Sequence, residues 1–261
     1  MIKHAIRNSE IIEEKDATVS VVNREVQYSF SVYEGLKVLN SKVVLLEDHV
    51  KRLKLSASTI GLEMLDYDFE ADINKLIEVD NIKEATLRVL VIGGADPTCF
   101  ITWTTILSYP DEYYINGVSV YSYKGERFLP SCKTSNILLN YLALEEAKRH
   151  NGFEALLVNK DNLILEGSRT NFFALKGNNL YTAKDDLVLE GITRKYILRA
   201  AEEMGLNIHF EAINLDDVLL YDGLFISSTS MVALPISSLD GKNIPLDKRV
   251  LELKRLTEKY N

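Results

Sequence analysis

Hydrophobic and polar positions alternate over short distances in the first hundred residues, and this pattern predicts strands mixed with helices. Two stretches repeat apolar residues at helical spacing between charged ones, and Gly61 ends the first of them. We expect helices at 47–61 and 69–78. Runs of β-branched and aromatic residues predict strands at 17–22, 32–39, 86–92 and 100–107. This part of the chain is therefore predicted to be a small N-terminal α/β domain, at residues 1–108.

A polar segment that contains Pro110 follows the last of these strands, and it predicts an interdomain linker at 109–116. Beyond it, the same patterns predict helices at 136–149 and 193–204. Strands are expected at 118–123, 155–158, 163–165, 171–175 and 180–182, the last four as two hairpins. The chain is therefore predicted to have an α+β fold, with a larger mixed α/β domain at 117–261.

The composition is that of an ordinary globular protein, and it narrows the classes of function. The 261 residues carry a formal net charge of −8 without a concentrated basic cluster, so nucleic acid is not an expected partner. The N-terminus has no apolar run of signal-peptide length, and no stretch is long enough to span a membrane. Cys99 and Cys132 are therefore expected to be reduced thiols in the cytoplasm. The histidines are scattered, so no metal site is expected.

Four pieces of the chain carry groups that could act in chemistry. They are Lys133 before a helix, LEGSRTN at 165–171, EGITR at 190–194 and the hydroxyl run SSTS at 227–230. Each piece has an ordinary explanation when it is taken alone. Lys133 could be a surface lysine, Glu166 a solvated turn residue, and 191–193 a simple helix start. Their order and spacing along one chain carry more weight than any of them singly.

Further motifs stand in the same order along the chain. The full set is 23–24, 32–34, 47–53, 133–136, 166–171, 191–194, 228–229, 234–235 and 240–241. Over roughly 220 residues this set resembles the fold-type IV pyridoxal-phosphate enzymes, which comprise branched-chain aminotransferases, D-amino-acid aminotransferases and aminodeoxychorismate lyases. The resemblance implies a two-domain, D-amino-acid aminotransferase-like architecture with pyridoxal 5'-phosphate as cofactor. It also implies a homodimer in which the loop at 93–99 reaches toward the partner's site.

The resemblance implies a role at the cofactor for each matching residue. Lys133 would hold the cofactor as a Schiff base and, once released, would move a proton, which a partly desolvated amine does readily. Glu166 would face the pyridine nitrogen and keep it protonated. Backbone N–H groups at a helix start, hydroxyls and a guanidinium would bind the phosphate: Arg52, Ile192, Thr193, Ser228 and Thr229. The alternative for Arg52 is a solvated helix residue, and His49 is expected to be a packed or capping histidine.

Two residues of the first part bear on the branch of the family. Tyr33, in Val-Tyr-Glu, matches an active-site tyrosine of the aminotransferases, which favours transamination over the lyase reaction. Arg88, in Thr-Leu-Arg-Val-Leu, resembles an arginine of the branched-chain enzymes that helps accept the distal carboxylate of glutamate. The D-amino-acid enzymes use a cationic pair in the following loop, whereas 95–99 of this chain contains no cation. A carboxylate trap of the D-specific kind is therefore not expected.

Three features depart from the branched-chain pattern. Residues 28–31 replace a Phe-Gly-Asp-Gly motif, and Lys133 is followed by Thr-Ser-Asn, as in the other branches. Arg169 stands where these relatives usually have a small residue beside the cofactor. One hypothesis is that Arg169 anchors a substrate carboxylate. The alternative is a salt bridge between domains or subunits.

The sequence predicts amino-group transfer between an apolar, branched-chain L-amino acid and 2-oxoglutarate, with Lys133, Glu166 and Tyr33 as catalytic residues. Arg88 and Arg169 are the candidate substrate contacts. D-Amino-acid transamination and the lyase reaction are the alternatives within the family. A catalytically inactive binding relative is the alternative outside it, and the presence of both Lys133 and Glu166 argues against that reading.

Overall fold

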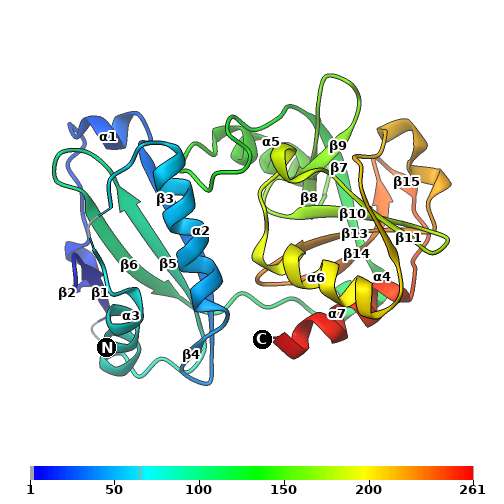
Figure 1. Ribbon diagram of the computed structural model, residues 1–261. Helices are drawn as coiled ribbons and strands as arrows, with labels where there is room; N and C mark the ends of the chain where they lie inside the picture. The colour runs from blue at the N-terminus through cyan, green and yellow to red at the C-terminus, as the bar shows by residue number, and fades with distance from the viewer. Residues whose placement is uncertain (1–2, 65, 261) are drawn as a thin grey trace. The chain divides into compact units, whose positions relative to one another are not determined.

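The computed structural model describes residues 3–64 and 66–260, and it divides into two compact units (Figure 1). The first unit comprises Met1–Leu107 and Cys132–Asn136, and the second comprises Ser108–Ser131 and Ile137–Asn261. Each unit contains a sheet with helices packed on it, so the predicted α+β class is confirmed. No helix in the described part of the chain is long and apolar enough to cross a membrane.

The first unit is built on a six-stranded sheet with the order β2-β1-β6-β5-β3-β4. Its strands are β1 His4–Arg7, β2 Glu10–Glu13, β3 Ser31–Leu39, β4 Lys42–Val43, β5 Ala85–Ile92 and β6 Thr98–Thr104. Its helices are α1 Arg24–Gln27, α2 Leu46–Thr59 and α3 Phe69–Val79, with a 3-10 turn at Glu14–Asp16. Leu53 of α2 and Ile73 of α3 share one buried cluster with β3 and β5, so both helices cover the same face of the sheet (Figure 1).

Strand β3 shows how the sequence period distributes side chains between the two faces. Buried and partly exposed residues alternate along it, because successive side chains of a strand point to opposite faces. Val32, Leu36 and Val38 join the core under the helices. Glu34 has the same parity, so its carboxylate also points to the helix-covered face, whereas Tyr33 points to the other face.

The second unit contains a nine-stranded sheet with the order β12-β11-β10-β13-β14-β7-β8-β9, and β15 pairs with β14. An additional pairing of β9 with β10 closes β10, β13, β14, β7, β8 and β9 into a ring. The strands are β7 Val118–Lys124, β8 Glu154–Val158, β9 Ile164–Gly167, β10 Asn171–Lys176, β11 Asn179–Thr182, β12 Asn207–Phe210, β13 Gly223–Ser228, β14 Val232–Leu239 and β15 Lys242–Asn243. The closed ring leaves fewer unpaired edges than an open sheet would.

Helices pack on the outside of this ring, so its strands have an inner face and a helix-covered outer face. They are α4 Asp111–Asn116, α5 Leu138–Arg149, α6 Ile192–Glu203 and α7 Arg249–Thr257, with 3-10 turns at Asp185–Leu187, Leu215–Leu220 and Glu258–Tyr260. Phe172 and Ile226 belong to a cluster drawn from all the ring strands, which is the interior. Phe173 and Phe225, one residue away, stack at 4.7 Å on the outer face and pack against α6 and α7.

The strand predicted at 17–22 is wrong. The structure has irregular backbone there, and the side chains of Val21 and Val22 are 83% and 78% exposed. β-Branched composition does not produce a strand where no neighbouring strand pairs with the segment. The other predicted helices and strands are present within a few residues of their expected ends.

The linker predicted at 109–116 is also wrong. Residues 111–116 form α4, and the rings of Tyr109 and Tyr113 pack edge-on against Phe153 at 5.4 and 5.7 Å. The Tyr114 hydroxyl donates to the Met231 carbonyl at 3.2 Å. The segment is polar by composition, but its tyrosines supply an apolar surface that packs on the second unit. The expected boundaries also differ because 132–136 belongs to the first unit, so neither 1–108 nor 117–261 is one unit.

Candidate active site

In the first unit, helix α2 and strand β3 enclose a cluster of charged side chains. Arg52 donates from Nε to Oε1 of Glu34 and from Nη2 to Oε2, each at 2.7 Å, and Nδ1 of His49 lies 2.7 Å from Oε2. His49 and Glu34 are 1% exposed. Burial alone would raise the pKa of Glu34, but the hydrogen bonds from Arg52 and His49 outweigh it and lower that pKa to about 2. Glu34 is therefore ionised and fixes the Arg52 guanidinium, while His49 is packed, as predicted.

Lys133 is held against the same two elements by its backbone. Its N–H donates to the Ser56 hydroxyl of α2 at 3.0 Å, and its carbonyl accepts from the Tyr33 N–H of β3 at 3.0 Å. Thr134 forms an antiparallel bridge with Val32, so the segment continues the sheet at this point. These bonds fix the Lys133 backbone, and its Nζ lies 4.7 Å from the centroid of the Tyr33 ring. Its side chain is partly buried.

The Tyr33 ring carries a second cation. The Arg88 guanidinium carbon of β5 lies 4.2 Å from the ring centroid. In the register of β3 and β5, Arg88 stands opposite Gly35, two residues from Tyr33. Because Gly35 has no side chain, Arg88 can lean toward the tyrosine. Arg88 is exposed, and no carboxylate of the described residues forms an ion pair with it.

In the second unit, Glu166 lies at the seam where the ring of strands closes. It pairs with Asn171 across β9 and β10, and Asn171 in turn pairs with Ser227 of β13. Residues that stand opposite each other on neighbouring strands point to one face, so these three side chains share the outer face. Glu166 accepts from Arg127 Nη1 at 3.3 Å and from the Leu189 N–H at 3.1 Å, and its side chain is 6% exposed. It is a buried, compensated charge and not the solvated turn residue of the alternative reading.

Helix α6 starts beside this seam. Gly191 caps it without a side-chain hydrogen bond, which leaves the N–H groups of Ile192 and Thr193 at the positive end of the helix dipole. A Cβ at Gly191 would lie 2.1 Å from Oδ1 of Asn171, so only glycine allows this close approach. The guanidinium of Arg194 is buried and donates to the Ala183 carbonyl at 2.8 Å, which fastens the helix start.

The hydroxyl run 227–230 ends strand β13. The Ser228 and Ser230 hydroxyls lie 3.1 Å apart, and the Tyr109 hydroxyl is 3.4 Å from that of Ser230. Ser227 is 1% exposed, and its hydroxyl has no hydrogen-bond partner among the described residues. Val232, just after the run, has a φ of +61°, which is strained for a β-branched residue. The structure thus places a tight, hydroxyl-rich turn next to the seam strand.

Arg169 lies in the loop between β9 and β10 and turns toward the start of β8. Its Nε is 3.4 Å from Oε2 of Glu154, and its Nη2 donates to the Phe153 carbonyl at 3.0 Å. The guanidinium carbon is 5.2 Å from the centre of the Phe153 ring. Arg169 therefore forms an ion pair inside the second unit.

Comparison with known proteins places these motifs in a family. The model of "Amino-transferase class IV" matches residues 31–239. The chain belongs to the class IV aminotransferases. It is 30% identical to a D-alanine aminotransferase of Bacillus licheniformis, covering 93% of each chain. It is also 30% identical to a putative branched-chain-amino-acid aminotransferase of Methanocaldococcus jannaschii, covering 97% of this chain and 93% of that one.

Solved structures of this class share the fold. The branched-chain amino acid aminotransferase of Escherichia coli superimposes with a TM-score of 0.88 at 22% identity, covering 98% of this chain and 92% of that chain. A further branched-chain amino acid aminotransferase, solved with pyridoxamine 5'-phosphate, gives 0.90 at 21% identity, covering 99% of this chain and 94% of that chain. The predicted architecture is confirmed. Class IV aminotransferases depend on pyridoxal 5'-phosphate, so the chain is a pyridoxal-phosphate-dependent transferase, as predicted.

The residues of the described chain fit this cofactor. The first unit carries an amine at Lys133 and a guanidinium at Arg52, and the second unit carries a buried carboxylate at Glu166, which are the types of group that such a cofactor needs. No side chain of the N-cap residue, Gly191, binds the N–H groups at the start of α6. This helix start suits a phosphate, because its N–H groups and the helix dipole both favour an anion. The Ser227 hydroxyl, on the same face as Glu166, is a further buried polar group that has no hydrogen-bond partner among residues 3–64 and 66–260.

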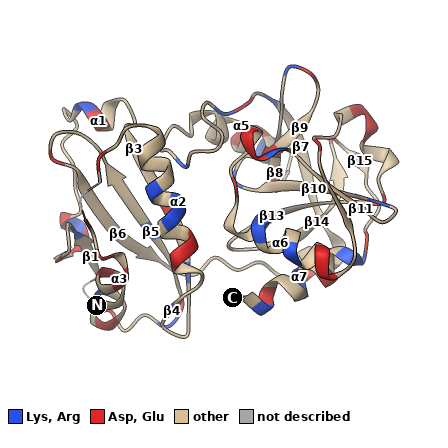
Figure 2. Cartoon of the chain, viewed as in Figure 1, with Lys and Arg blue, Asp and Glu red and all other residues tan. Residues whose placement is uncertain are grey.

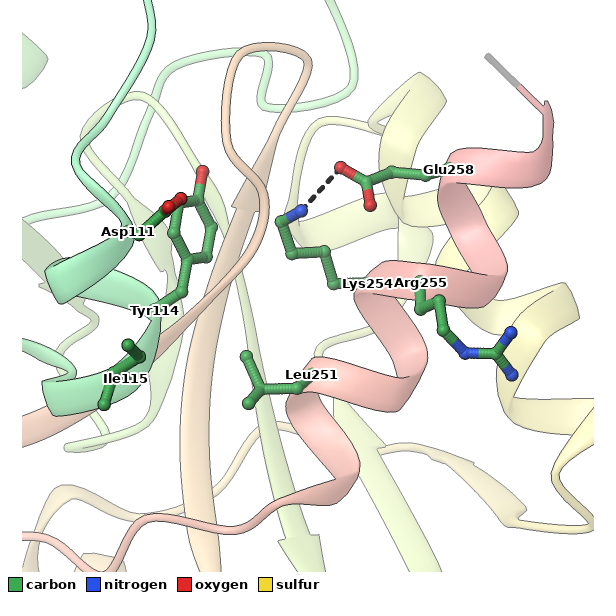
Figure 3. Close-up of a pocket in the computed structure, with 7 residues that line it drawn as sticks. All are labelled: Asp111, Tyr114, Ile115, Leu251, Lys254, Arg255 and Glu258. Atoms are coloured by element: carbon green, nitrogen blue, oxygen red, sulfur yellow. Dashed lines mark hydrogen bonds and ion pairs between the residues drawn. The ribbon is translucent and has the colours of Figure 1, made fainter.

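A pocket on the second unit lies away from these residues. It has a volume of about 420 Å³ and is lined from α4, α7 and the following 3-10 turn by Asp111, Tyr114, Ile115, Leu251, Lys254, Arg255 and Glu258 (Figure 3). Lys254 pairs with Glu258 at 2.6 Å and lies 4.9 Å from the centre of the Tyr114 ring. None of the candidate site residues predicted from the sequence lines this pocket, so the pocket is not assigned to the catalytic site.

Sequence reasoning missed three charged residues that hold the site residues in place. Glu34 fixes Arg52, Arg127 compensates Glu166, and Glu154 binds Arg169. Only Glu34 had a usable signal, because it shares the parity of buried Val32 and Leu36 along β3. Figure 2 shows acidic and basic positions mixed along helices such as α2, so charge alone did not mark these three.

Proposed function

We propose that this class IV aminotransferase exchanges the amino group between an apolar, branched-chain L-amino acid and 2-oxoglutarate. The observation that carries the proposal is Arg88. It is an exposed guanidinium on the face of Tyr33, 4.2 Å from that ring, and no carboxylate of the described residues pairs with it. A second carboxylate is what distinguishes glutamate and 2-oxoglutarate from apolar substrates, and a guanidinium is suited to bind it. The loop at 95–99 supplies no competing cation.

In this proposal, each candidate residue has a stated role toward the cofactor. When bound, pyridoxal 5'-phosphate supplies an electron sink for the substrate α-carbon. Lys133 would hold the cofactor through Nζ, and the same amine could take and return the proton at the substrate α-carbon. The Tyr33 ring, 4.7 Å from Nζ, limits where that amine can move. Glu166 would accept a hydrogen bond from the pyridine nitrogen and would keep a proton there.

We assign phosphate binding to Arg52, to the N–H groups of Ile192 and Thr193, and to Ser228 and Thr229. Two features support this assignment. Glu34 holds the Arg52 guanidinium in one orientation, which reduces the conformational entropy lost when an anion binds. Gly191 leaves the start of α6 open to a ligand.

D-Amino-acid transamination is the second candidate. D-Alanine aminotransferases are among the relatives at 30% identity, and Lys133 is followed by Thr-Ser-Asn. The absence of a cation from 95–99 argues for the L-amino-acid reading, because the D-specific carboxylate trap needs one.

We also propose a cytoplasmic homodimer. Leu138, Tyr141 and Leu142 are 66%, 62% and 47% exposed on one side of α5, and an apolar helix face of this kind marks an interaction surface. Neither cysteine of the described chain forms a disulfide and both are buried, which suits a reducing compartment. If the α5 face is the subunit interface, a Tyr141→Asp variant should lose the dimer mass in light scattering, whereas an unchanged mass would exclude this face.

The reaction is tested by adding single substrates to the yellow holoenzyme. The absorbance of the bound cofactor should change with L-leucine and with L-glutamate, and should not change with D-alanine. A response to D-alanine alone would replace the proposal with the D-amino-acid reading. Lys133→Ala should abolish the response to every substrate.

Substitution of Arg88 tests the substrate pair. Arg88→Met should raise the KM for 2-oxoglutarate at least tenfold, which corresponds to a loss of about 1.4 kcal/mol or more in binding free energy. The KM for L-leucine should stay nearly unchanged. Lys37→Met is the matched control, because Lys37 is a cation of the same parity as Tyr33 on β3. Equal changes for both substrates would show that Arg88 does not select 2-oxoglutarate.

A further inference from the structure

Glu154 is a buried carboxylate that the proposed reaction does not use. It is 0% exposed at the start of β8, with the parity of Leu156 and Val158, which belong to the interior of the ring. Burial raises its pKa, and Arg169 and Ser168 offset only part of that effect. A charge is costly to bury in a sheet interior, so a compensating role is expected for its partners.

The partners of Glu154 all belong to one loop or to its own strand. Its Oε1 accepts from the Ser168 hydroxyl at 2.5 Å and from the Ala155 N–H at 2.8 Å. Its Oε2 faces Arg169 Nε at 3.4 Å. Ser168 and Arg169 are two of the three residues that connect β9 to β10, and the Gly167 N–H donates to the carbonyl of the third, Thr170, at 2.7 Å. The carboxylate thus binds two of the three residues of the loop.

The same loop is fastened from two further directions. The Ser168 N–H donates to the Ala155 carbonyl at 2.8 Å, and Asn140 of α5 donates to the Ser168 carbonyl at 2.6 Å. Space around the loop is small, since a Cβ at Gly167 would lie 1.9 Å from the Thr170 hydroxyl and 3.3 Å from the Glu154 carboxyl carbon. The loop therefore has one tightly held conformation.

The residues that flank this loop form the seam of the ring. Glu166 lies two residues before Ser168, Asn171 directly follows Thr170, and Glu166 and Asn171 pair with each other across β9 and β10. That pairing is the only register contact between these strands in the described chain. The position of Glu166 relative to Asn171 therefore depends on the conformation of the connecting loop.

We propose that Glu154 and Arg169 are a pair of positioning residues, which hold the β9–β10 loop so that Glu166 and Asn171 meet at the seam. In this assignment Arg169 compensates a buried charge and does not anchor a substrate carboxylate. Its contacts to the Phe153 carbonyl and ring extend the pair along the start of β8. The link to catalysis rests on the proposed role of Glu166 at the cofactor.

A double-mutant cycle of Glu154→Gln and Arg169→Met tests the pair, because both substitutions remove charge and keep much of the volume. Each single variant should lower the Tm by about 4–8 °C and weaken binding of pyridoxal 5'-phosphate to the cofactor-depleted protein about fivefold. The double variant should be no worse than the poorer single variant, because it leaves neither charge uncompensated. A matched cycle at Glu252 and Arg255, an exposed pair on α7, should show no coupling.

Two results would overturn the proposal. Additive effects of the two substitutions on Tm would show that the residues do not act as a pair. A rise in the KM for 2-oxoglutarate in Arg169→Met, with unchanged Tm and cofactor affinity, would make Arg169 a substrate anchor. A wild-type protein that binds no pyridoxal 5'-phosphate would overturn the proposed function instead, and the Tm cycle would still test the pair.

Discussion

Glu34 in the first unit and Glu154 in the second are both almost fully buried, at 1% and 0% exposure. Burial raises the pKa of each carboxyl, but the outcomes differ. Arg52 and His49 together bring the pKa of Glu34 down to about 2, whereas the pKa of Glu154 remains above its usual value. The two side chains are almost equally shielded from solvent, so the hydrogen-bond donors around each carboxylate decide the direction of its pKa shift.

The donors differ in number and in geometry. Arg52 presents two N–H groups to Glu34 at 2.7 Å each, and its side chain is only 10% exposed. Arg169 approaches Glu154 with one long contact of 3.4 Å and is 40% exposed, so water weakens its charge. A forked, buried guanidinium makes a carboxylate a permanent charge, whereas a half-exposed one leaves it only partly compensated.

The largest effect is expected on replacing the first carboxylate. Glu34→Gln leaves Arg52 and His49 without their counter-charge in the core, so the free energy of unfolding should fall by about 3–5 kcal/mol. Glu154→Gln keeps acceptors for Ser168 and Ala155 and relieves a poorly compensated charge, so about 1–2 kcal/mol is expected. Urea denaturation of both variants measures the difference. Equal losses would break the comparison between the two units.

The contributions of Glu34 and Glu154 to stability should change with pH in opposite directions. The folded-state pKa of Glu34, about 2, is below the usual value of 4.5, so its contribution is complete above pH 4.5 and is lost as the pH falls toward 2. That shift corresponds to about 3 kcal/mol at most. Glu154 has a raised pKa, so its contribution is complete below pH 4.5 and is lost as the pH rises through the folded-state pKa.

The variants make this sign difference measurable. Unfolding free energies from pH 3 to 7 should show a flatter acid limb in Glu34→Gln than in the wild type. Glu154→Gln should instead lose less stability than the wild type as the pH rises above 4.5. The same pH dependence in both variants would contradict the opposite directions of the two pKa shifts.

The ion pair of Arg127 with Glu166 in the second unit is the counterpart of the pair of Arg52 with Glu34 in the first. Arg127 Nη1 lies 3.3 Å from Glu166 and 2.8 Å from the Pro130 carbonyl, and its side chain is 7% exposed. Arg127→Met should weaken binding of pyridoxal 5'-phosphate about tenfold and destabilise the protein by about 1–3 kcal/mol, because a buried charge loses its cation. Arg127→Lys keeps the charge and should recover part of both losses. Equal behaviour of the two variants would mean that the charge on Arg127 is unimportant.

The comparison also shows which parts of the site a sequence can reveal. Collinear motifs pointed to Arg52, Lys133 and Glu166 as candidates, and the helical spacing of 47–61 predicted the helix that carries Arg52. Strand parity could have placed Glu34 on the buried face. Arg127 left no such signal, since it lies outside any helix or strand and binds a residue 39 positions later in the chain. Helix α4 was missed because tyrosines, which count as polar in a loop, provide its packing surface.

The smallest effect is expected at the contact that joins Lys133 to α2. Ser56 is 1% exposed, and its hydroxyl accepts from the Lys133 N–H at 3.0 Å. Ser56→Ala should cost about 1 kcal/mol and weaken binding of pyridoxal 5'-phosphate about threefold, because the backbone of Lys133 loses one of its hydrogen bonds. Ser58→Ala is the control, since that exposed hydroxyl only donates to the Leu55 carbonyl of its own helix. Ser56 lies seven residues after His49 and four after Arg52, so all three point from one side of α2. If Ser56→Ala behaves like Ser58→Ala, the helix positions Arg52 but not Lys133, and its role is confined to the Glu34 cluster.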